Sequence, residues 1–334
     1  MRGFLLLSHM KYVRIEGSRK LSSFIEPMKA QLSDLPPFDS NEWIFEIKWD
    51  GYRAIAEVNG DGNKLYSRNG LTFDKAYPKI FDALKKIKKK VVVDGEIVVF
   101  DEKGKPNFQK LQNYRSNDKF IIQYYVFDIL YLNGKNVTSL PVVERKKLLK
   151  DLLPKSETIL YCDHVDSEGK ALFQEMKKMN LEGMIAKRKN SKYYIGKRTP
   201  DWLKIKNVQT QEAIIVGFTE PKGSRSSFGS LILAVRKRGK LVSVGNVGTG
   251  FTDKSLKELH TKLKKLIRKT SPLDIPIKQT PDMTWVQPEL VCNVKYTELT
   301  DDGSIRHPVF QGLRIDKPAK DVELERPVKN KNRR

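Results

Sequence analysis

Alternating runs of apolar residues dominate residues 41–206 and predict a domain that mixes strands with helices. Short runs rich in β-branched and aromatic residues predict strands at 43–48, 54–58, 91–100, 121–130, 183–187 and 202–206. Amphipathic stretches predict helices at 74–89, 143–153 and 168–179, and Ser167 precedes the last of these as a candidate N-cap. This alternation is typical of a domain built around sheets with helices packed on them.

The pattern changes after Asn207, where short strands predominate. We predict strands at 213–218, 230–235, 241–247 and 290–299, and one helix at 253–268 behind a turn and cap at 249–252. Short strands, glycine-containing turns and a single helix are typical of a small β-barrel. We therefore expect two domains, residues 21–207 and 208–322. Residues 1–20 are set aside as an irregular extension in which Ser8-His9-Met10 is a candidate cloning junction, and residues 323–334 are expected to form a disordered basic tail.

Three of the predicted strands carry charged residues two positions apart, which places each pair on one face because side chains alternate along a strand. For any one strand the simpler interpretation is an ordinary half-exposed strand. The three strands together predict charge on one side and apolar side chains on the other. The pairs are Glu46 with Lys48, Asp94 with Glu96, and Lys204 with Lys206.

Composition indicates a polyanionic partner. The 334 residues include 63 Lys and Arg against 40 Asp and Glu, which gives a formal net charge of +23 at pH 7. Nucleic acid is the partner that best fits a soluble chain with this excess of positive charge. The lysine-rich run at residues 85–90 is better explained as a solvated surface than as a nucleic-acid contact.

Cysteine content and hydropathy indicate a reducing compartment. Cys162 and Cys292 lie far apart in the sequence, which indicates neither a disulfide framework nor a zinc finger. The apolar stretch at residues 3–7 is too short for a signal peptide, and no later stretch approaches the ~20 apolar residues of a membrane span. We expect a cytoplasmic, nucleoid-associated monomer without a membrane contact.

A series of short motifs resembles one enzyme family. Lys48-Trp49-Asp50-Gly51 is similar to the nucleotide-attachment motif of ATP-dependent DNA ligases. The stretches 285–289 and 307–314 look most like the ligase module of the bacterial end-joining ligases. The resemblance covers residues 25–319 and implies an α+β fold, with an ATP-grasp-like nucleotidyltransferase (adenylation) domain of antiparallel sheets and helices before an OB-fold β-barrel. Further segments follow in the family order: residues 67–70, 93–98, 127–128, 181–187, 202–206 and 314–317.

The resemblance implies that Lys48 is the nucleophile that takes AMP from ATP. Attack on the α-phosphorus needs a neutral amine, whereas the ordinary pKa of lysine is ~10.4. Lys204 and Lys206, which the resemblance places across the pocket, are expected to lower that pKa and to receive the phosphate charge. Glu96 and Glu182 are the candidate holders of Mg²⁺, for which Mn²⁺ can substitute, and Glu96 can instead bind the ribose.

Other residues of the nucleotide site are assigned by the same resemblance. Glu46 would accept a hydrogen bond from the adenine amino group and favour ATP over GTP, and Ile47 belongs to the same site. Phe127 would stack on adenine, although a core aromatic residue is an equal alternative on such an apolar strand. Arg68 would contact the ribose and the nick.

DNA contacts and a domain movement are also implied. Arg53 is similar to the residue that clamps the 5′-phosphate, a task suited to a planar guanidinium. Arg314, Asp316 and Lys317 resemble the motif that orients pyrophosphate in the first step, which requires the second domain to swing about a hinge near Asn207. The loop at 221–229 is suited either to DNA phosphates or to a plain exposed hairpin.

We therefore predict an ATP-dependent DNA ligase that seals 3′-OH/5′-phosphate nicks in duplex DNA, for repair or end joining, with a Ku-type protein as a candidate partner. One alternative is an RNA ligase or an mRNA capping guanylyltransferase, which labelling with ATP or GTP and sealing of DNA or RNA would distinguish. A second alternative is a DNA-binding module without catalytic activity. Loss of nick sealing in Lys48→Ala with DNA binding intact would argue against it.

Overall fold

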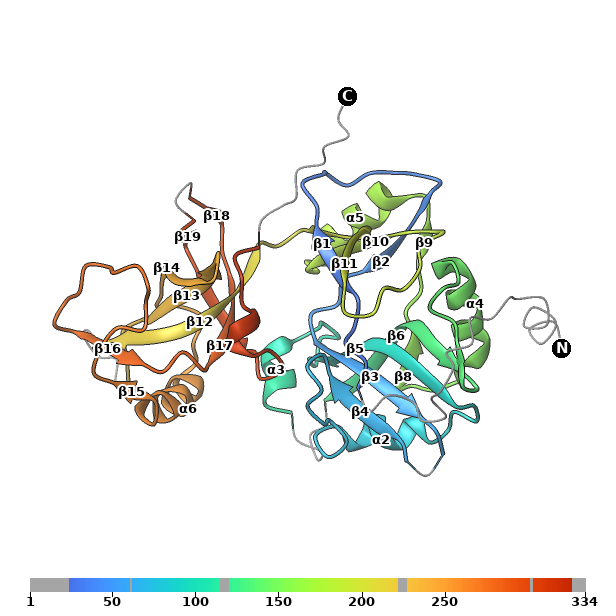
Figure 1. The fold of residues 1–334 in the computed structure, drawn as a ribbon, viewed down its shortest axis with the longest axis horizontal. Helices are drawn as coiled ribbons and strands as arrows, with labels where there is room; N and C mark the ends of the chain where they lie inside the picture. The colour runs from blue at the N-terminus through green and yellow to red at the C-terminus, as the bar shows by residue number, and fades with distance from the viewer. Residues whose placement is uncertain (1–23, 61, 115–119, 222–226, 301–302, 326–334) are drawn as a thin grey trace. The chain divides into compact units, whose positions relative to one another are not determined.

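A computed structural model describes residues 24–60, 62–114, 120–221, 227–300 and 303–325. The predictions for residues 1–20, for most of the loop at 221–229 and for most of the basic tail lie outside the described residues. The chain separates into two compact units, the first ending at Asn207 and the second beginning at Val208 (Figure 1). In the described ranges, no helix is long and apolar enough to cross a membrane.

The first unit is built on two sheets (Figure 1). The six-stranded sheet has the order β4-β3-β5-β6-β7, with β8 beside β6, and the five-stranded sheet has the order β1-β11-β10-β2-β9. Pairing is antiparallel except between β1 and β11 and between β6 and β8. The strands of the larger sheet are β3 Tyr52–Val58, β4 Lys64–Ser67, β5 Val91–Phe100, β6 Ile121–Leu132, β7 Lys135–Asn136 and β8 Ile159–Tyr161. Those of the smaller sheet are β1 Lys29–Leu32, β2 Trp43–Ile47, β9 Val165–Asp166, β10 Gly183–Arg188 and β11 Arg198–Lys206.

Helices pack against both sheets. Helices α2 (Pro78–Leu84), α3 (Phe108–Gln112) and α4 (Val142–Leu152) lie with the larger sheet, and α5 (Gly169–Lys178) packs on β2 and β10. A second, smaller core lies between the sheets, because Ile55, Val92 and Leu130 of the larger sheet pack with Trp202 of the smaller sheet and with Tyr193 of the loop between β10 and β11. β5 is accordingly buried over most of its length, which explains its nearly continuous run of valine and isoleucine.

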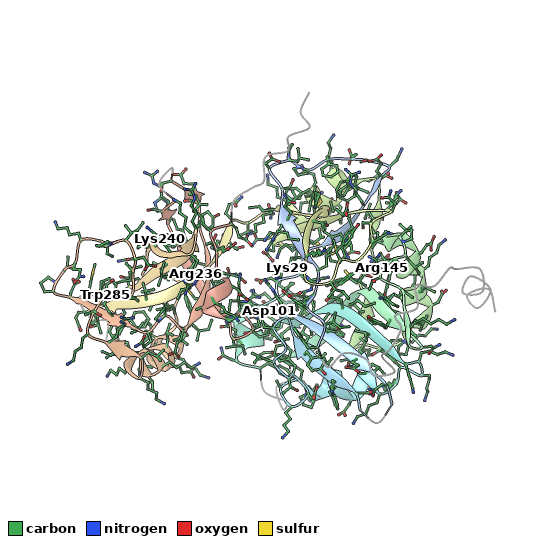
Figure 2. All side chains as sticks on the ribbon, viewed as in Figure 1. Lys29, Asp101, Arg145, Arg236, Lys240 and Trp285 are labelled. Atoms are coloured by element: carbon green, nitrogen blue, oxygen red, sulfur yellow. The ribbon has the colours of Figure 1, made fainter. Side chains whose placement is uncertain are left out.

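A buried ion pair ties α4 to β6. Arg145, labelled in Figure 2, lies on α4, and its Nε and Nη2 donate to Asp128 Oδ1 and Oδ2 at 2.7 and 2.9 Å. Nη1 donates to the carbonyl of Ser191 at 2.9 Å, which also anchors the loop between β10 and β11. Both charged side chains are fully buried. Burial raises the pKa of Asp128, but the attraction and hydrogen bonds of Arg145 outweigh it and hold the pKa below its ordinary value.

We expect Arg145→Met to lower the free energy of unfolding by about 3–5 kcal/mol, because it leaves the Asp128 carboxylate buried without its partner. Urea unfolding followed by circular dichroism measures this loss. Arg188→Met is the matched control, since Arg188 is partly exposed and pairs with exposed Glu42; we expect it to cost less than about 1 kcal/mol. Equal losses in the two variants would contradict this account of Arg145.

The second unit is a small barrel with one helix (Figure 1). Strand β12 is its longest, and it pairs with β13 along one edge and with β17 and then β16 along the other. A register shift between Ile215 and Gly217 accompanies the change of partner. The strands are β12 Thr210–Thr219, β13 Leu231–Lys237, β14 Lys240–Val247, β15 Ile267–Arg268, β16 Met283–Val286, β17 Val291–Lys295, β18 Glu298–Leu299, β19 Ile305–Arg306 and β20 Val309–Leu313, with helix α6 Asp253–Lys264 and a 3₁₀ turn at Ala319–Asp321.

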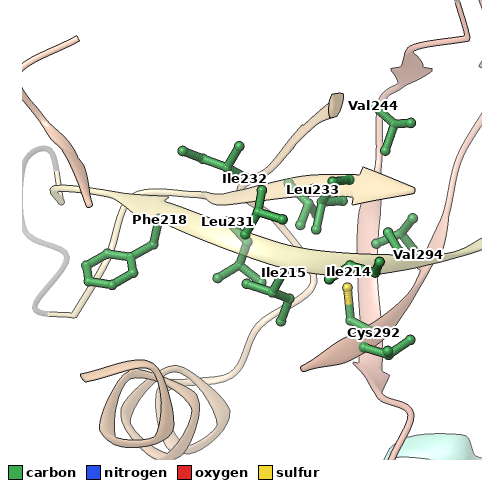
Figure 3. Packing of buried hydrophobic residues seen from close by; sticks show 14 of the residues in the cluster. Ile214, Ile215, Phe218, Leu231, Ile232, Leu233, Val244, Cys292 and Val294 are labelled. Carbon is green, nitrogen blue, oxygen red and sulfur yellow. The ribbon is translucent and has the colours of Figure 1, made fainter. Parts of the chain in front are cut away.

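The core of this barrel is aliphatic. Figure 3 shows Ile214 and Leu233 of β12 and β13 packed near Cys292 and Val294 of β17. Cys292 is fully buried and has no disulfide partner, and burial raises the pKa of its thiol above the ordinary value. It therefore acts as a small apolar side chain of the core.

The expected α+β class is confirmed, and the helix and strand predictions hold with four corrections. The helix predicted at 74–89 is shorter, because Pro78 occupies its first turn and the chain leaves the helix after Leu84. Ser167 is not an N-cap: it has φ +67°, and Glu168 precedes the helix without a side-chain cap. The helix predicted at 253–268 has the expected Thr252 cap but ends at Lys264. The strand predicted at 290–299 is two strands, β17 and β18, and β19 and β20 follow it.

Candidate active site

Three neighbouring strands, β2, β10 and β11, bring charged residues to one face of the smaller sheet. Residues opposite each other in an antiparallel pair share a face. Glu46 lies opposite Ile185, and Ile185 lies opposite Lys204. In the next row, the Lys48 amide donates to the carbonyl of Gly183 at 2.9 Å. We call this side the charged face; it carries Glu46, Lys48, Lys187, Lys204 and Lys206.

The opposite face of the same strands packs against α5. Phe45, Met184 and Ile205 belong to one buried cluster there with Met176 of α5. Ile47 also packs against this cluster. The side chain of Ile47, which the sequence assigns to the nucleotide site, therefore lies on the face opposite Glu46.

The motif at residues 48–51 links the two sheets. β2 ends at Ile47 and β3 begins at Tyr52, so Lys48 stands where the chain leaves one sheet for the other. The Trp49 ring stacks on Tyr125 of β6 with the ring centroids 4.1 Å apart. A Cβ on Gly51 would lie 2.1 Å from the carbonyl oxygen of Ile97. Any other residue type would therefore clash with β5 unless that strand moved. The glycine thus lets the backbone approach β5 closely and fixes where Lys48 sits.

Lys48 forms an ion pair with Glu182, the residue just before β10. The Lys48 side chain is 22% exposed and that of Glu182 is 10% exposed. Burial lowers the pKa of Lys48, but the attraction and hydrogen bond of Glu182, with weaker attraction from Asp50 and Glu96, raise it above the ordinary value.

The predicted lowering of the Lys48 pKa by neighbouring cations is therefore wrong for this arrangement. Lys204 and Lys206 lie on the charged face with Lys48, as the strand alternation predicts. Carboxylates nevertheless dominate the electrostatic surroundings of the Lys48 amine. The pairing with Glu182 favours the ammonium form of Lys48 in this arrangement.

We expect Glu182→Gln to lower the pKa of Lys48, because it removes the main opposing charge and leaves burial opposed only by the weaker attraction of Asp50 and Glu96. The fraction of neutral amine at a given pH then rises, and so does the rate at which an acylating reagent labels Lys48. Labelling as a function of pH, followed by peptide mass spectrometry, measures the shift. Glu175→Gln on the exposed side of α5 is the control. An unchanged labelling profile in Glu182→Gln would show that Glu182 does not govern this amine.

The larger sheet places a second cation opposite the charged face. Arg53 on β3 donates from Nε and Nη2 to Asp94 at 3.0 and 2.5 Å, and Tyr193 Oη donates to Asp94 at 2.6 Å. Asp94 is fully buried. One edge of the guanidinium is therefore fixed by Asp94, and the N–H groups at its other end remain for an anion. The Arg68 amide donates to the Arg53 carbonyl at 3.1 Å, so the two predicted arginines are neighbours.

Phe127 lies between the sheets and contacts both. The Arg53 guanidinium lies 5.2 Å and Lys187 Nζ 4.6 Å from its ring centroid, and Trp202 meets the ring edge-to-face at 6.3 Å. The ring is half-buried and packs against the core between the sheets. It is thus both a core contact and an aromatic surface beside the charged face.

Glu46 is buried between two lysines. Lys146 Nζ lies 2.5 Å from Oε1 and Lys187 Nζ lies 2.7 Å from Oε2. Neither lysine has a role predicted from the sequence, although Lys187 ends the motif segment at residues 181–187. Alternation from Gly183 would place Lys187 on the charged face, but no local signal distinguishes Lys146 among the lysines of α4.

The carboxylates fit a magnesium ion that also binds a nucleotide. Among the described residues, no three Asp, Glu, His or Cys side chains form a metal cluster. Magnesium is commonly held by one or two carboxylates together with substrate phosphates and waters, so a full protein cage is not required. Glu182 and Glu96 both act on the Lys48 amine; Glu182 directly precedes β10 of the smaller sheet, and Glu96 lies on β5 of the larger sheet. They are suited to share such an ion beside Lys48.

The three residues predicted at 314–317 form a compact network in the second unit. Arg314 donates from Nε and Nη2 to the two oxygens of Asp316 at 2.8 and 2.7 Å, and Asp316 is fully buried. Lys317 forms an ion pair with Glu212 of β12, and Arg314 Nη2 lies 3.7 Å from the same carboxylate. Glu212 is a member of this network that the sequence analysis missed.

Comparison with known proteins agrees with this geometry. Residues 25–206 match the family model described as ATP dependent DNA ligase domain, and residues 224–317 match the ATP dependent DNA ligase C terminal region. The multifunctional non-homologous end joining protein LigD of Pseudomonas aeruginosa is 37% identical over 93% of this chain, and that of Mycolicibacterium smegmatis is 36% identical over 90%. The chain spans about two fifths of their lengths, 38% and 39% respectively.

Solved structures show the same two-part architecture. A mycobacterial DNA ligase D, complexed with ATP and MES, is 32% identical over 92% of this chain and all of its own, with a TM-score of 0.67. The ligase domain of Mycobacterium tuberculosis LigD is 33% identical over 91% of this chain and 99% of its own, with a TM-score of 0.53. The adenylation domain and OB fold expected from the motifs are thereby confirmed. The chain belongs to the ATP-dependent DNA ligase family and is similar to the ligase domains of the bacterial end-joining ligases.

Proposed function

We propose that this chain seals nicks between a 3′-OH and a 5′-phosphate in duplex DNA at the expense of ATP. The observation that carries the proposal is Lys48, held by Glu182 at the edge of the charged face, with Arg53 on the facing sheet. Lys48 Nζ attacks the α-phosphorus of ATP, so that an N–P bond forms and the bond to pyrophosphate breaks. The DNA 5′-phosphate then takes the AMP, and the 3′-hydroxyl displaces it as the new phosphodiester forms.

The first transfer requires Lys48 to lose both its proton and its partner. Its raised pKa disfavours the neutral amine while Glu182 is bound. Glu96 and Glu182 would hold Mg²⁺ or Mn²⁺, which compensates charge on the triphosphate and the leaving pyrophosphate. Lys204 and Lys206, on the same face as Lys48, would bind the phosphate charge that remains.

The base and ribose would lie along the charged face from Lys48 toward Glu46. We assign Glu46 to the adenine amino group, Phe127 to stacking on the base, and Glu96 or Arg68 to the ribose. Support comes from the aromatic ring of Phe127 beside Lys187 and Glu46 at one end of the face, with Lys48 and Glu182 at the other. Arg53 keeps free N–H groups beyond Asp94, which suits the 5′-phosphate of the nick.

Orientation of pyrophosphate is assigned to Arg314, Asp316 and Lys317. They belong to the second unit, so this role requires that unit to approach the nucleotide site in the first transfer and to leave it for DNA. Support comes from the network that fixes Arg314 against Asp316 and from the matching of residues 224–317 to the C-terminal region of the ligases.

The proposal is tested by incubating the purified chain with ATP and magnesium and then with a nicked duplex. We expect one AMP on the protein, found on the peptide that carries Lys48, and its consumption as the nick is sealed. A chain that never acquires AMP, although its circular dichroism is native, would contradict the proposal. A chain that acquires AMP but seals only RNA would assign it to the RNA ligases instead.

We expect binding to duplex DNA to weaken as salt is added. The logarithm of the association constant should fall linearly with the logarithm of the salt concentration, with a slope of about −0.9 for each phosphate neutralised. The formal charge of +23 and the phosphate chemistry of the reaction both favour backbone contacts. Fluorescence anisotropy with labelled nicked duplexes measures the slope. Two duplexes of unrelated sequence serve as the control, because their slopes and affinities should agree. A flat salt dependence would contradict a backbone-dominated interface.

A role in end joining, with a Ku-type protein that binds DNA ends as partner, is the corresponding proposal for the cell. It rests on the names of the relatives, which describe end joining proteins. The test is whether the cognate Ku protein binds this chain and stimulates joining of linear duplexes. Absence of both effects would remove the partner and leave the nick-sealing activity untouched.

A further inference from the structure

Lys146 is a buried lysine on α4 whose amine forms an ion pair with Glu46. Its side chain is 1% exposed and that of Glu46 is 3% exposed. Nζ lies 2.5 Å from Glu46 Oε1, donates to the carbonyl of Cys162 at 2.8 Å, and lies 4.8 Å from the centroid of the Tyr161 ring. Two of its three N–H donors are therefore used inside the protein, and the Tyr161 ring lies beside it. An amine satisfied in this way is suited to hold Glu46 rather than to bind a ligand.

The second lysine at Glu46 differs from the first. Lys187 lies on the charged face, 2.7 Å from Glu46 Oε2, and its Nζ is 4.2 Å from the Trp202 ring centroid. Burial lowers the pKa of Lys146, but the attraction of Glu46 outweighs it and the pKa is raised. Burial also lowers the pKa of Lys187, and there the opposing attraction does not restore it. Both lysines lie against the Glu46 carboxylate, and Lys146 is the one that hydrogen bonds to Glu46 and to the Cys162 carbonyl hold in place.

The position of Glu46 connects this pair to the base. Residue 46 lies on β2 and residue 48 follows directly after the strand, at an extended-chain spacing of about 7 Å. Lys48 marks the phosphate end of the proposed nucleotide, and the Phe127 ring lies beside Lys187 and hence near Glu46. A carboxylate at that end can accept a hydrogen bond from the 6-amino group of adenine. The 6-oxo group of guanine at the same place is another acceptor, so no hydrogen bond forms between it and the Glu46 carboxylate.

We propose that Lys146 is a positioning residue for purine selection, which holds the Glu46 carboxylate in the orientation that accepts the 6-amino group and rejects the 6-oxo group. This inference rests on the proposed lysyl-AMP chemistry at Lys48. A buried carboxylate keeps its charge and its rotamer only while a partner compensates for lost water. With Oε1 tied to Lys146 and Oε2 near Lys187, the remaining lone pairs of Glu46 have a fixed direction.

The test compares the rates at which lysyl-AMP and lysyl-GMP form on Lys48. We expect wild type to prefer ATP, and Lys146→Met to reduce that preference by about 10- to 100-fold, the range of one charge-assisted hydrogen bond. Lys146→Arg keeps a cation and should restore most of the preference. Lys147→Met, at the neighbouring exposed position of α4, is the matched control and should leave it unchanged. If Lys146→Met does not fold, Lys146→Gln is used in its place, because the glutamine amide still offers a donor to the Cys162 carbonyl.

A double variant separates positioning from a general loss of structure. With Glu46→Gln already present, Lys146→Met should change the ATP-to-GTP ratio no further, because the carboxylate that it orients is gone. A full preference for ATP in folded Lys146→Met and Lys146→Gln, or an equal loss in Lys147→Met, would overturn the inference. If wild type forms neither lysyl-AMP nor lysyl-GMP, the proposed function itself fails, which is a distinct outcome.

Discussion

Lys48→Ala is expected to abolish transfer of AMP to the protein and, with it, ATP-dependent sealing of nicks. The N–P bond of the first transfer forms on Nζ of this residue in the proposed reaction, because Lys48 is the lysine that pairs with Glu182 at the start of the link between the two sheets. Lys48→Arg should be equally inactive, since a guanidinium keeps its charge at any accessible pH and cannot act as the neutral nucleophile. Intact mass measured after incubation with ATP and magnesium reports the loss.

Two controls make this result specific. Lys178→Ala removes an exposed lysine of α5 that pairs with Glu175, and it should leave AMP transfer unchanged. A nick that already carries AMP on its 5′-phosphate bypasses Lys48, so Lys48→Ala should still seal it and should still bind the duplex. AMP found on another lysine of Lys48→Ala would contradict the assignment of the nucleophile.

Much of the charged face could be predicted because it depends on local geometry. Alternation along a strand placed Glu46 with Lys48 and Lys204 with Lys206 from the sequence alone, and the pairing of β2, β10 and β11 agrees with both. The same rule put Val93 and Ile97 on the other side of β5, where they belong to the core of the larger sheet. Strands with a buried apolar face specify their orientation strongly.

The electrostatics of Lys48 could not be predicted in this way. Its partner Glu182 is 134 positions away in the chain. Glu182 lies beside Lys48 because the Lys48 amide donates a hydrogen bond to the carbonyl of the next residue, Gly183. Gly183 has φ +150°, and a Cβ there would lie 2.2 Å from the carbonyl oxygen of Ile205, so a close approach of β10 to β11 sets the position of Glu182. The sign of the pKa shift follows from this long-range contact.

Lys146 shows a second limit of the sequence. It lies in the run Glu144-Arg145-Lys146-Lys147, where charged residues normally indicate a solvated helix face. The structure instead buries Arg145 and Lys146 and leaves Lys147 exposed. Charged residues are seldom buried unless paired, and both partners, Asp128 and Glu46, lie on strands distant in the chain. Composition cannot reveal such pairs.

Arg314→Ala is expected to slow transfer of AMP to Lys48 by about 10²–10³-fold, the typical cost of removing one group that stabilises developing charge. Asp316 accepts hydrogen bonds from two N–H groups of Arg314, so the guanidinium is oriented before any phosphate arrives. Preorganisation of this kind has its effect in the transition state, when charge grows on the leaving pyrophosphate. Single-turnover formation of lysyl-AMP measures the rate.

The same variant should seal a nick that already carries AMP at close to the wild-type rate, because no pyrophosphate leaves in that step. Arg306→Ala removes an exposed arginine of β19 that pairs with Glu298 of the adjacent strand β18, and it should leave both rates unchanged. Equal slowing of both steps in Arg314→Ala would indicate that Arg314 supports the fold of the barrel or contacts DNA. Slowing confined to the first step would instead locate its action at the triphosphate, since that is the only step in which the leaving group carries two phosphates.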